Sequence, residues 1–315
     1  MNQTLSSQFP FPFQDDTYRY SNNSRPLDPP YCLDMTQEYE GEIRLKRELL
    51  EKYPDRCFQS FPHTLEAQWE VLDMLVHEMA VIHPSSFSLL KNDDLWTFTN
   101  HRTGEEHRFV FGDASTLPCE PLDFIGRHIQ EDLVLVMQRD GNLYMDAGQL
   151  CFPANWSIKF DLGMSYTEFH SPVPVFSDSG IAAKVRDFLM RMEAGKPWTR
   201  YNWTMTVDGR YDTFPENFDE WGPEREKVTA ENAGETVYLR VEDQRLFRLL
   251  RSQAILFSIH THLISLEELI QNEAWGVRLQ KVLIDLPDYI CEYKGFSGYK
   301  DEIIGYLKNK LPIRS

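Results

Sequence analysis

The sequence predicts an α+β fold, in which one antiparallel sheet is flanked by helices and extended by further helices at both ends. Two observations support this prediction. Apolar residues recur at helical spacing near both ends of the chain, whereas the middle alternates with a period of two and carries hairpin turns. We therefore divide the 315 residues into an N-terminal arm and helical cap (1–85), a sheet domain (86–263) and C-terminal helices (264–315).

The N-terminal part begins with an irregular arm. Residues 1–30 are rich in Ser, Asn, Pro and aromatic residues. Asp34 is a candidate N-cap for a first helix, and Thr64 precedes a second apolar stripe that ends near Met79. These two helices are expected to cap the sheet.

Two hairpins are expected next. Residues 95–111 alternate around a polar, glycine-containing turn, and residues 133–152 alternate around Asp140 and Gly141, a dipeptide typical of tight hairpins. A short helix is predicted between them, over residues 121–130.

The second half of the chain completes the sheet. Apolar spacing predicts a helix over 181–193, and period-two alternation predicts strands over 199–207, 236–250 and 255–263. Residues 208–235 are acidic and rich in Gly and Pro, which predicts a long loop or lid.

The composition restricts the partners and the compartment. The net charge of −17, from 49 acidic and 32 basic residues, disfavours nucleic acid and favours cationic ligands or a basic protein, although solubility alone also explains it. No apolar run approaches the ~20 residues of a membrane-spanning helix. The N-terminus lacks the features of a secretory signal, and the five cysteines are scattered and odd in number. A cytoplasmic protein is expected.

One histidine stands in an unusual setting. His170 is followed by Pro172 and Pro174, which predicts a stiff, extended segment that cannot join a regular ladder. Neutral imidazole is the usual axial ligand of a haem that binds oxygen on its other face. The alternative is a histidine that is structural or simply exposed.

Two predicted strands carry polar residues on one face. Alternation places Arg240, Glu242 and Gln244 together, and Arg200 and Asn202 likewise share a face. An inward arginine would clamp a carboxylate such as a propionate, and an inward glutamate would hold an ammonium or relay a proton. The alternative is a solvated sheet face with cross-strand ion pairs.

Other chemistry has less support. His260 and His262 share a strand face, a spacing found in some zinc sites, but no third ligand is evident nearby. The chain has no G-x-S-x-G, no P-loop and no G-x-G-x-x-G, so hydrolases and nucleotide-binding proteins find no local support.

Six motifs in order give the chain a resemblance to a known family. They are Gln130-Glu-Asp-Leu133, Cys151-Phe-Pro-Ala-Asn-Trp156, His170-Ser-Pro-Val-Pro174, Arg200-Tyr-Asn-Trp203, Arg240-Val-Glu-Asp-Gln-Arg-Leu246 and Ala254-Ile-Leu-Phe-Ser-Ile259. Their order and spacing resemble the haem-binding α-subunit family of haem-dependent oxidative N-demethylase. The resemblance runs from about residue 33 to about residue 269.

The resemblance implies a PAS-like domain that holds haem b and demethylates a small secondary amine such as dimethylamine, with O₂ consumed and formaldehyde formed. Electrons would come from a separate reductase subunit with flavin and iron–sulfur centres. His170 matches the family's axial ligand to the haem iron. Further residues implied to bind the cofactor are Arg200, Asn202 and Arg240, and those implied to act in the distal pocket are Glu242, Gln244 and Tyr238.

Three alternatives stay open at this point. The chain could be a haem-based PAS sensor or haem carrier without turnover, or a scaffold subunit of a larger complex. A zinc hydrolase built on His260 and His262 is the third.

Overall fold

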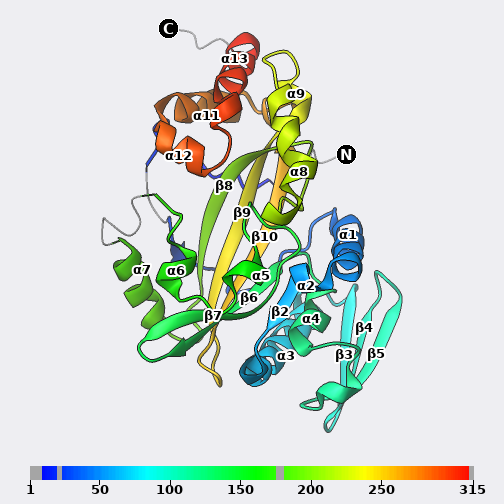
Figure 1. The fold of residues 1–315 in the computed structure, drawn as a ribbon. Coiled ribbons are helices and arrows are strands. Elements are labelled where there is room, and N and C mark those ends of the chain that lie inside the picture. Colours follow the sequence, from blue (N-terminus) through cyan, green and yellow to red (C-terminus); the bar gives the residue numbers. More distant parts are fainter. Residues whose placement is uncertain (1–8, 20–22, 175–180, 312–315) are drawn as a thin grey trace.

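A computed structural model describes residues 9–19, 23–174 and 181–311. It has the predicted α+β architecture, with a large antiparallel sheet, a small sheet and helices around both (Figure 1). Among the described residues, no helix combines the length and the apolar character needed to cross a membrane. The ends of the predicted arm and of the C-terminal helices, 1–8 and 312–315, lie outside the described residues.

In the described ranges the large sheet has seven strands, and each neighbouring pair is antiparallel. In spatial order they are β1 (Arg25–Pro26), β8 (Trp198–Val207), β9 (Val237–Arg248), β10 (Ile255–Ser265), β6 (Asp132–Arg139), β7 (Asn142–Gln149) and β2 (Phe58–Ser60). The predicted strands in the second half of the chain are confirmed. The β6–β7 turn is also confirmed, with positive φ angles at Asp140 (51°) and Gly141 (70°), as tight hairpin turns require.

The first predicted hairpin is confirmed, but it is not part of the large sheet. β4 (Leu95–Asn100) and β5 (Glu105–Val110) join β3 (Phe87–Asn92) in a separate three-stranded sheet. Its inner face packs on helix α3 (Leu65–Ile82), where Phe109 is buried against Trp69 and Trp96 against His77. The three-part division of the chain stays a prediction.

One of the two N-terminal helices begins as predicted, and the other begins later. The N-cap of α3 is Thr64, as predicted. Helix α1 (Tyr39–Lys52) begins later than Asp34 predicts, and α2 (Pro54–Cys57) follows it. The reason is tertiary: the backbone N–H of Asp34 donates to Glu131 Oε1 at 2.8 Å, so this segment is held in an irregular conformation against the start of β6.

Short helices that lie between β7 and β8 along the chain cover one face of the large sheet. They are α5 (Ile158–Asp161), α6 (Tyr166–Phe169) and α7 (Ile181–Met190), while α4 (Pro121–Gly126) precedes β6. The predicted loop 208–235 contains α8 (Phe218–Trp221) and leads into α9 (Ala233–Thr236), with two 3₁₀ turns, Pro215–Asn217 and Gly222–Lys227, so it is less irregular than expected.

The C-terminal helices gather at one end of the long strands (Figure 1). They are α10 (Leu266–Leu269), α11 (Glu273–Asp285), α12 (Asp288–Tyr293) and α13 (Lys300–Lys310). Their apolar side chains form one core with Trp203, Met205 and Val241 of the sheet. This packing fixes the end of α12 against β8, which positions part of the site described next.

Candidate functional site

The polar residues of β8 and β9 lie on one face of the large sheet. Register pairs Arg200 with Gln244 and Asn202 with Glu242, and Glu242 pairs in turn with Thr261 of β10. This face is not solvated, because Glu242 is 3% exposed and Gln244 is 7% exposed. The alternative of a solvated face with ion pairs is therefore wrong: the helices and loops between β7 and β9 cover this face.

Glu242 is the centre of this polar face. Its Oε2 accepts hydrogen bonds from Asn202 Nδ2 (3.1 Å) and from Gln244 Nε2 (2.8 Å). Its Oε1 is buried and has no hydrogen-bond partner among the described residues, and its nearest cationic neighbour is Arg240 Nε at 3.9 Å. Buried polar atoms are nearly always hydrogen-bonded, so an orphaned carboxylate oxygen marks a place for a ligand or water.

Arg240 has a different role from the one the sequence suggests. It is 1% exposed, and burial lowers the pKa of its guanidinium. Its two terminal nitrogens donate to the carbonyls of Phe152 and Tyr211 and to Thr261 Oγ1. The planar fork is thus committed to tying β9 to two covering loops, and only Nε faces Glu242.

His170 stands at the end of a helix, not on an extended segment. Ser165 and Glu168 form a capping box that starts α6, and His170 is the C-cap residue with φ −97° and ψ 1°. The prediction of an extended backbone was wrong because this local S-x-x-E signal nucleates a helical turn. Pro172 and Pro174 follow only after the helix has ended.

The His170 ring is oriented by its own helix. Nδ1 donates to the Tyr166 carbonyl at 3.0 Å, and the ring packs on Tyr166 and Phe169 at centroid distances of 4.3 and 4.5 Å. Since a carbonyl only accepts, Nδ1 carries the proton and the lone pair is on Nε2. An Nδ1–H bonded to a backbone carbonyl is the usual arrangement of a histidine that ligates a metal through Nε2.

The electrostatics keep His170 neutral. Burial lowers its pKa to about 4, the hydrogen bond to Tyr166 opposes this, and the positive charge of Arg200 lowers it further. Tyr166 and Phe169, which contact the His170 ring, pack in one core cluster with Leu246 of β9. Leu246 points to the same face of β9 as Glu242 and Gln244, so His170 lies on the side of the polar face. A neutral imidazole near an arginine suits an axial ligand whose cofactor carries negative groups.

Lys294 completes this group and was not predicted. It follows α12, and its Nζ donates to the Trp203 carbonyl at 2.5 Å and to Asn202 Oδ1 at 3.5 Å. Burial lowers its pKa to about 8, Arg200 lowers it further, and Glu242 raises it. No spacing in the sequence links residue 294 to residue 202, because only the packing of the C-terminal helices brings them together.

Tyr238 lies apart from these residues. It is on the same face of β9, but four residues from Glu242, a distance of about 13 Å along a strand. Its ring lies against Gly209, where an added Cβ would be 3.1 Å from the ring, and its pKa is raised by burial and by Glu268 and Asp208. The structure does not bring Tyr238 to Glu242.

Comparison with known protein families agrees with the resemblance seen in the sequence. Residues 23–304 match the family model of the haem-dependent oxidative N-demethylase, alpha subunit-like, proteins. The chain belongs to this family. The family's name describes a haem-dependent oxidative N-demethylation, and the words alpha subunit imply that other subunits take part.

A second polar cluster lies near β10. His260 is buried, with Nδ1 3.5 Å from Glu131 Oε1 and Nε2 3.8 Å from Glu42 Oε2, and its ring centroid is 4.1 Å from that of His262. Burial raises the pKa of Glu42 to about 7 and that of Glu131 to about 8. Because the two carboxylates flank opposite sides of one ring, they do not converge on a single ion.

The described residues offer one other group of potential metal ligands, and it does not include His260 or His262. Glu105, His107 and His128 bring their ligand atoms within 4.8 Å of one another. Arg47 already binds both oxygens of Glu105 (2.9 and 2.7 Å) and lies 3.3 Å from His128 Nδ1. The arginine thus supplies the positive charge that a metal would bring.

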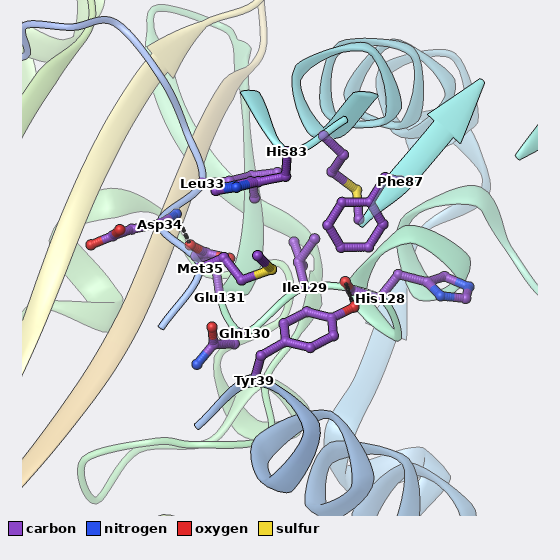
Figure 2. A pocket seen from close by; sticks show the side chains of 11 residues that line it. Leu33, Asp34, Met35, Tyr39, His83, Phe87, His128, Ile129, Gln130 and Glu131 are labelled. Carbon is purple, nitrogen blue, oxygen red and sulfur yellow. Dashed lines mark hydrogen bonds between the residues drawn. The ribbon is translucent and has the colours of Figure 1, made fainter. Parts of the chain in front are cut away.

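A small pocket lies beside the second polar cluster (Figure 2). Its space of about 220 Å³ includes open solvent, so it is a hollow at the surface and not a cavity of ligand size. Met35, Tyr39, Phe87 and Glu131 are among its lining residues, and none of the candidate residues from the polar face lines it. It is therefore separate from the site around Glu242.

Proposed function

We propose that this chain holds haem b and catalyses the O₂-dependent oxidative N-demethylation of a small methylated amine, such as dimethylamine, to formaldehyde and the demethylated amine. The observation that carries the proposal is a neutral, Nδ1-bonded His170 on the same side of the sheet as Glu242, whose Oε1 is orphaned. Family membership supplies the reaction class.

We further propose that the sheet domain is PAS-like. Counted along the chain, β6 and β7 come first, helices α5 to α7 follow, and β8, β9 and β10 complete the sheet. The last strand, β10, pairs with the first, β6, in the centre. This strand order supports a PAS-like arrangement, with the helices between the second and third strands covering the ligand side.

The charges of the site fit an anionic cofactor. Arg200 and Lys294 repel each other, and a negative propionate beside them would relieve this repulsion. In this proposal His170 is the axial ligand through Nε2. Arg200 is the first propionate partner, with Asn202 beside it. Arg240 supports the site by donating to the backbone carbonyls of Phe152 and Tyr211.

The substrate would be held by the orphaned oxygen. Haem, when bound, supplies the activation of O₂ and the oxidation of a C–H bond beside the amine nitrogen. Glu242 Oε1 would accept an N–H of the methylammonium in a charge-assisted hydrogen bond. Asn202 and Gln244 fix the carboxylate by donating to Oε2, so the amine is bound in one orientation. Tyr238 stays a more distant candidate.

Electrons would come from a separate reductase subunit with flavin and iron–sulfur centres. The net charge of −17 favours docking to a basic surface. A cytoplasmic location is part of the proposal, because all five cysteines are free thiols.

An absorption spectrum tests the cofactor. Haem-reconstituted protein should show a Soret band that shifts or is lost in His170→Ala, while His101→Ala, a change at an exposed histidine on the small sheet, leaves it unchanged. A reconstituted wild-type protein without a Soret band contradicts the proposal. With haem bound, reductant, O₂ and dimethylamine should yield formaldehyde; haem binding without formaldehyde leaves the sensor or scaffold alternative.

A further inference from the structure

Two of the five cysteines lie together beside helix α1. Cys57 ends α2, and Cys151 follows β7. Leu150 donates its backbone N–H to the Cys57 carbonyl at 2.7 Å, so the two segments run side by side as neighbouring strands do. Strands about 4.8 Å apart, with a step of about 3.4 Å to the next residue, place the two Cα atoms about 6 Å apart. A disulfide spans about 4.4–6.8 Å between Cα atoms, so the backbone is spaced for one.

The two sulfur atoms lie against the same stretch of α1. Cys57 Sγ is 3.6 Å from the carbonyl oxygen of Leu49, and Cys151 Sγ is 3.9 Å from that of Lys46, three residues earlier in the helix. Both cysteines are 0% exposed and belong to one core cluster. Their thiols share a hydrogen bond, so the pair is already in contact in the reduced protein.

The two thiols differ in acidity. The hydrogen bond with Cys151 lowers the pKa of Cys57, and the positive charge of Arg56 lowers it further, against the effect of burial. Burial raises the pKa of Cys151 well above its usual value, and the bond with Cys57 raises it further. The thiolate is the reactive form of cysteine. Cys57 is therefore the nucleophile of the pair, and Cys151 is the thiol placed to react with it afterwards.

Arg56 is placed to stabilise a thiolate at Cys57. Its guanidinium lies over the rings of Tyr53 and Phe214, 3.8 and 4.3 Å from their centroids. Arg56 is 8% exposed, and its Nε and Nη2 are buried without a hydrogen-bond partner among the described residues. A buried cation with unmade hydrogen bonds favours a negative charge beside it, and the thiol of the next residue supplies one when it ionises.

We propose that Cys57 and Cys151 are a redox site, where a peroxide closes a reversible disulfide. The Cys57 thiol would be oxidised to a sulfenic acid, and hydrogen peroxide would be reduced to water. The Cys151 sulfur would then attack that of Cys57, and its proton would leave with the hydroxyl group as a second water. Full burial restricts the reaction to an oxidant close to water in size.

The disulfide would adjoin the polar face without depending on a cofactor. Cys151 precedes Phe152, whose carbonyl accepts a hydrogen bond from Arg240. The inference goes beyond the proposed function, and it holds or fails whether or not the chain binds haem.

The test treats the full-length protein with hydrogen peroxide and maps its cysteines by non-reducing peptide mass spectrometry. We expect a cross-linked peptide that contains Cys57 and Cys151 and that dithiothreitol cleaves. Cys119 is the internal control, because it is the most exposed of the five cysteines but burial raises its pKa to about 12. Oxidation of Cys119 before any Cys57–Cys151 cross-link forms, or a cross-link that forms only in urea, overturns the inference.

Variants separate the two cysteines. In Cys151→Ser, Cys57 should stop at the sulfenic acid, which dimedone traps, whereas Cys151 should stay a thiol in Cys57→Ser. Cys291→Ser is the matched control: Cys291 is also buried, and burial raises its pKa to about 11, so the rate of cross-linking should not change. Dimedone labelling of Cys151 in Cys57→Ser would overturn the assignment of the nucleophile. If a variant does not fold, the wild-type cross-link decides alone.

The role of Arg56 has its own measurement. Arg56→Met should slow cross-linking about tenfold or more, because each unit by which a thiol pKa rises lowers the thiolate fraction about tenfold. Arg56→Lys keeps the charge and should retain part of the rate. Equal rates in Arg56→Met and the wild type would show that Arg56 does not activate Cys57.

Discussion

The substitution Lys46→Met should strongly destabilise the fold. Lys46 and Asp132 are an ion pair with exposed fractions of 0% and 1%, and the lysine also donates to the carbonyls of Ile129 and Glu131. Removing one partner of a buried pair costs roughly 3–5 kcal/mol, because the other charge stays buried and unpaired. Asp132 still accepts the backbone N–H groups of Cys151 and Phe152 (3.0 and 2.7 Å), so we expect a loss near 3 kcal/mol.

The same variant has a pH signature. Burial raises the pKa of Asp132, and Lys46 is the main opposing influence, so its removal raises that pKa further. A carboxyl group with a pKa above its unfolded value favours the folded state at low pH, and this contribution is lost as the pH rises through the folded pKa. The destabilisation should therefore be larger at pH 8 than at pH 5.

Urea unfolding followed by circular dichroism at both pH values measures the free energy of unfolding. Lys52→Met, an exposed change on the same helix, is the control and should leave the unfolding midpoint unchanged. A loss below about 1 kcal/mol in Lys46→Met, or a loss that grows towards low pH, would refute the reasoning.

Two further predictions follow from the site and the fold. In haem-loaded protein, Glu242→Gln should weaken dimethylammonium binding about tenfold to a hundredfold, because a neutral hydrogen bond replaces a charge-assisted one. Isothermal titration calorimetry measures the affinity, and an unchanged value would show that Glu242 does not bind the amine. Gly148→Ala should lower the free energy of unfolding, measured in urea, by about 1–3 kcal/mol, because the added Cβ would lie 3.1 Å from the Leu133 carbonyl oxygen. Gly41→Ala in α1 is the control: its Cβ would meet open space, so the change should be neutral or stabilising. A tolerated Gly148→Ala would mean that β6 and β7 can shift apart.

The sequence predicted the features that depend on the backbone geometry of a single strand or turn. Alternation was sufficient to place Glu242 with Gln244 on one face of β9 and Arg200 with Asn202 on one face of β8, because strand geometry projects every second side chain to the same side. That the two pairs share one side of the sheet follows from the register of β8 and β9. The Asp140–Gly141 hairpin was likewise predictable, since few dipeptides tolerate positive φ. The family could also be predicted from the sequence, because six motifs follow one another in the family's order.

The local prediction failed where two signals competed. Around His170 the prolines indicated extended backbone, but the Ser165–Glu168 capping box came first along the chain and started a helical turn. At Asp34 the N-cap signal was overridden by Glu131, which lies about 100 residues away and accepts the backbone N–H. A short window of sequence around Asp34 gives no sign of a contact with a residue so far along the chain.

The sequence by itself determined the fold class, the family and the alternation that lines up the polar face. Only the tertiary structure decided whether that face is buried, which oxygen of Glu242 lacks a partner, that Arg240 is committed to backbone carbonyls, and that Lys294 reaches Asn202. The reason is physical: periodicity fixes the direction of a side chain within its own element. Burial, charge pairing and unsatisfied hydrogen bonds depend on which distant element packs on top.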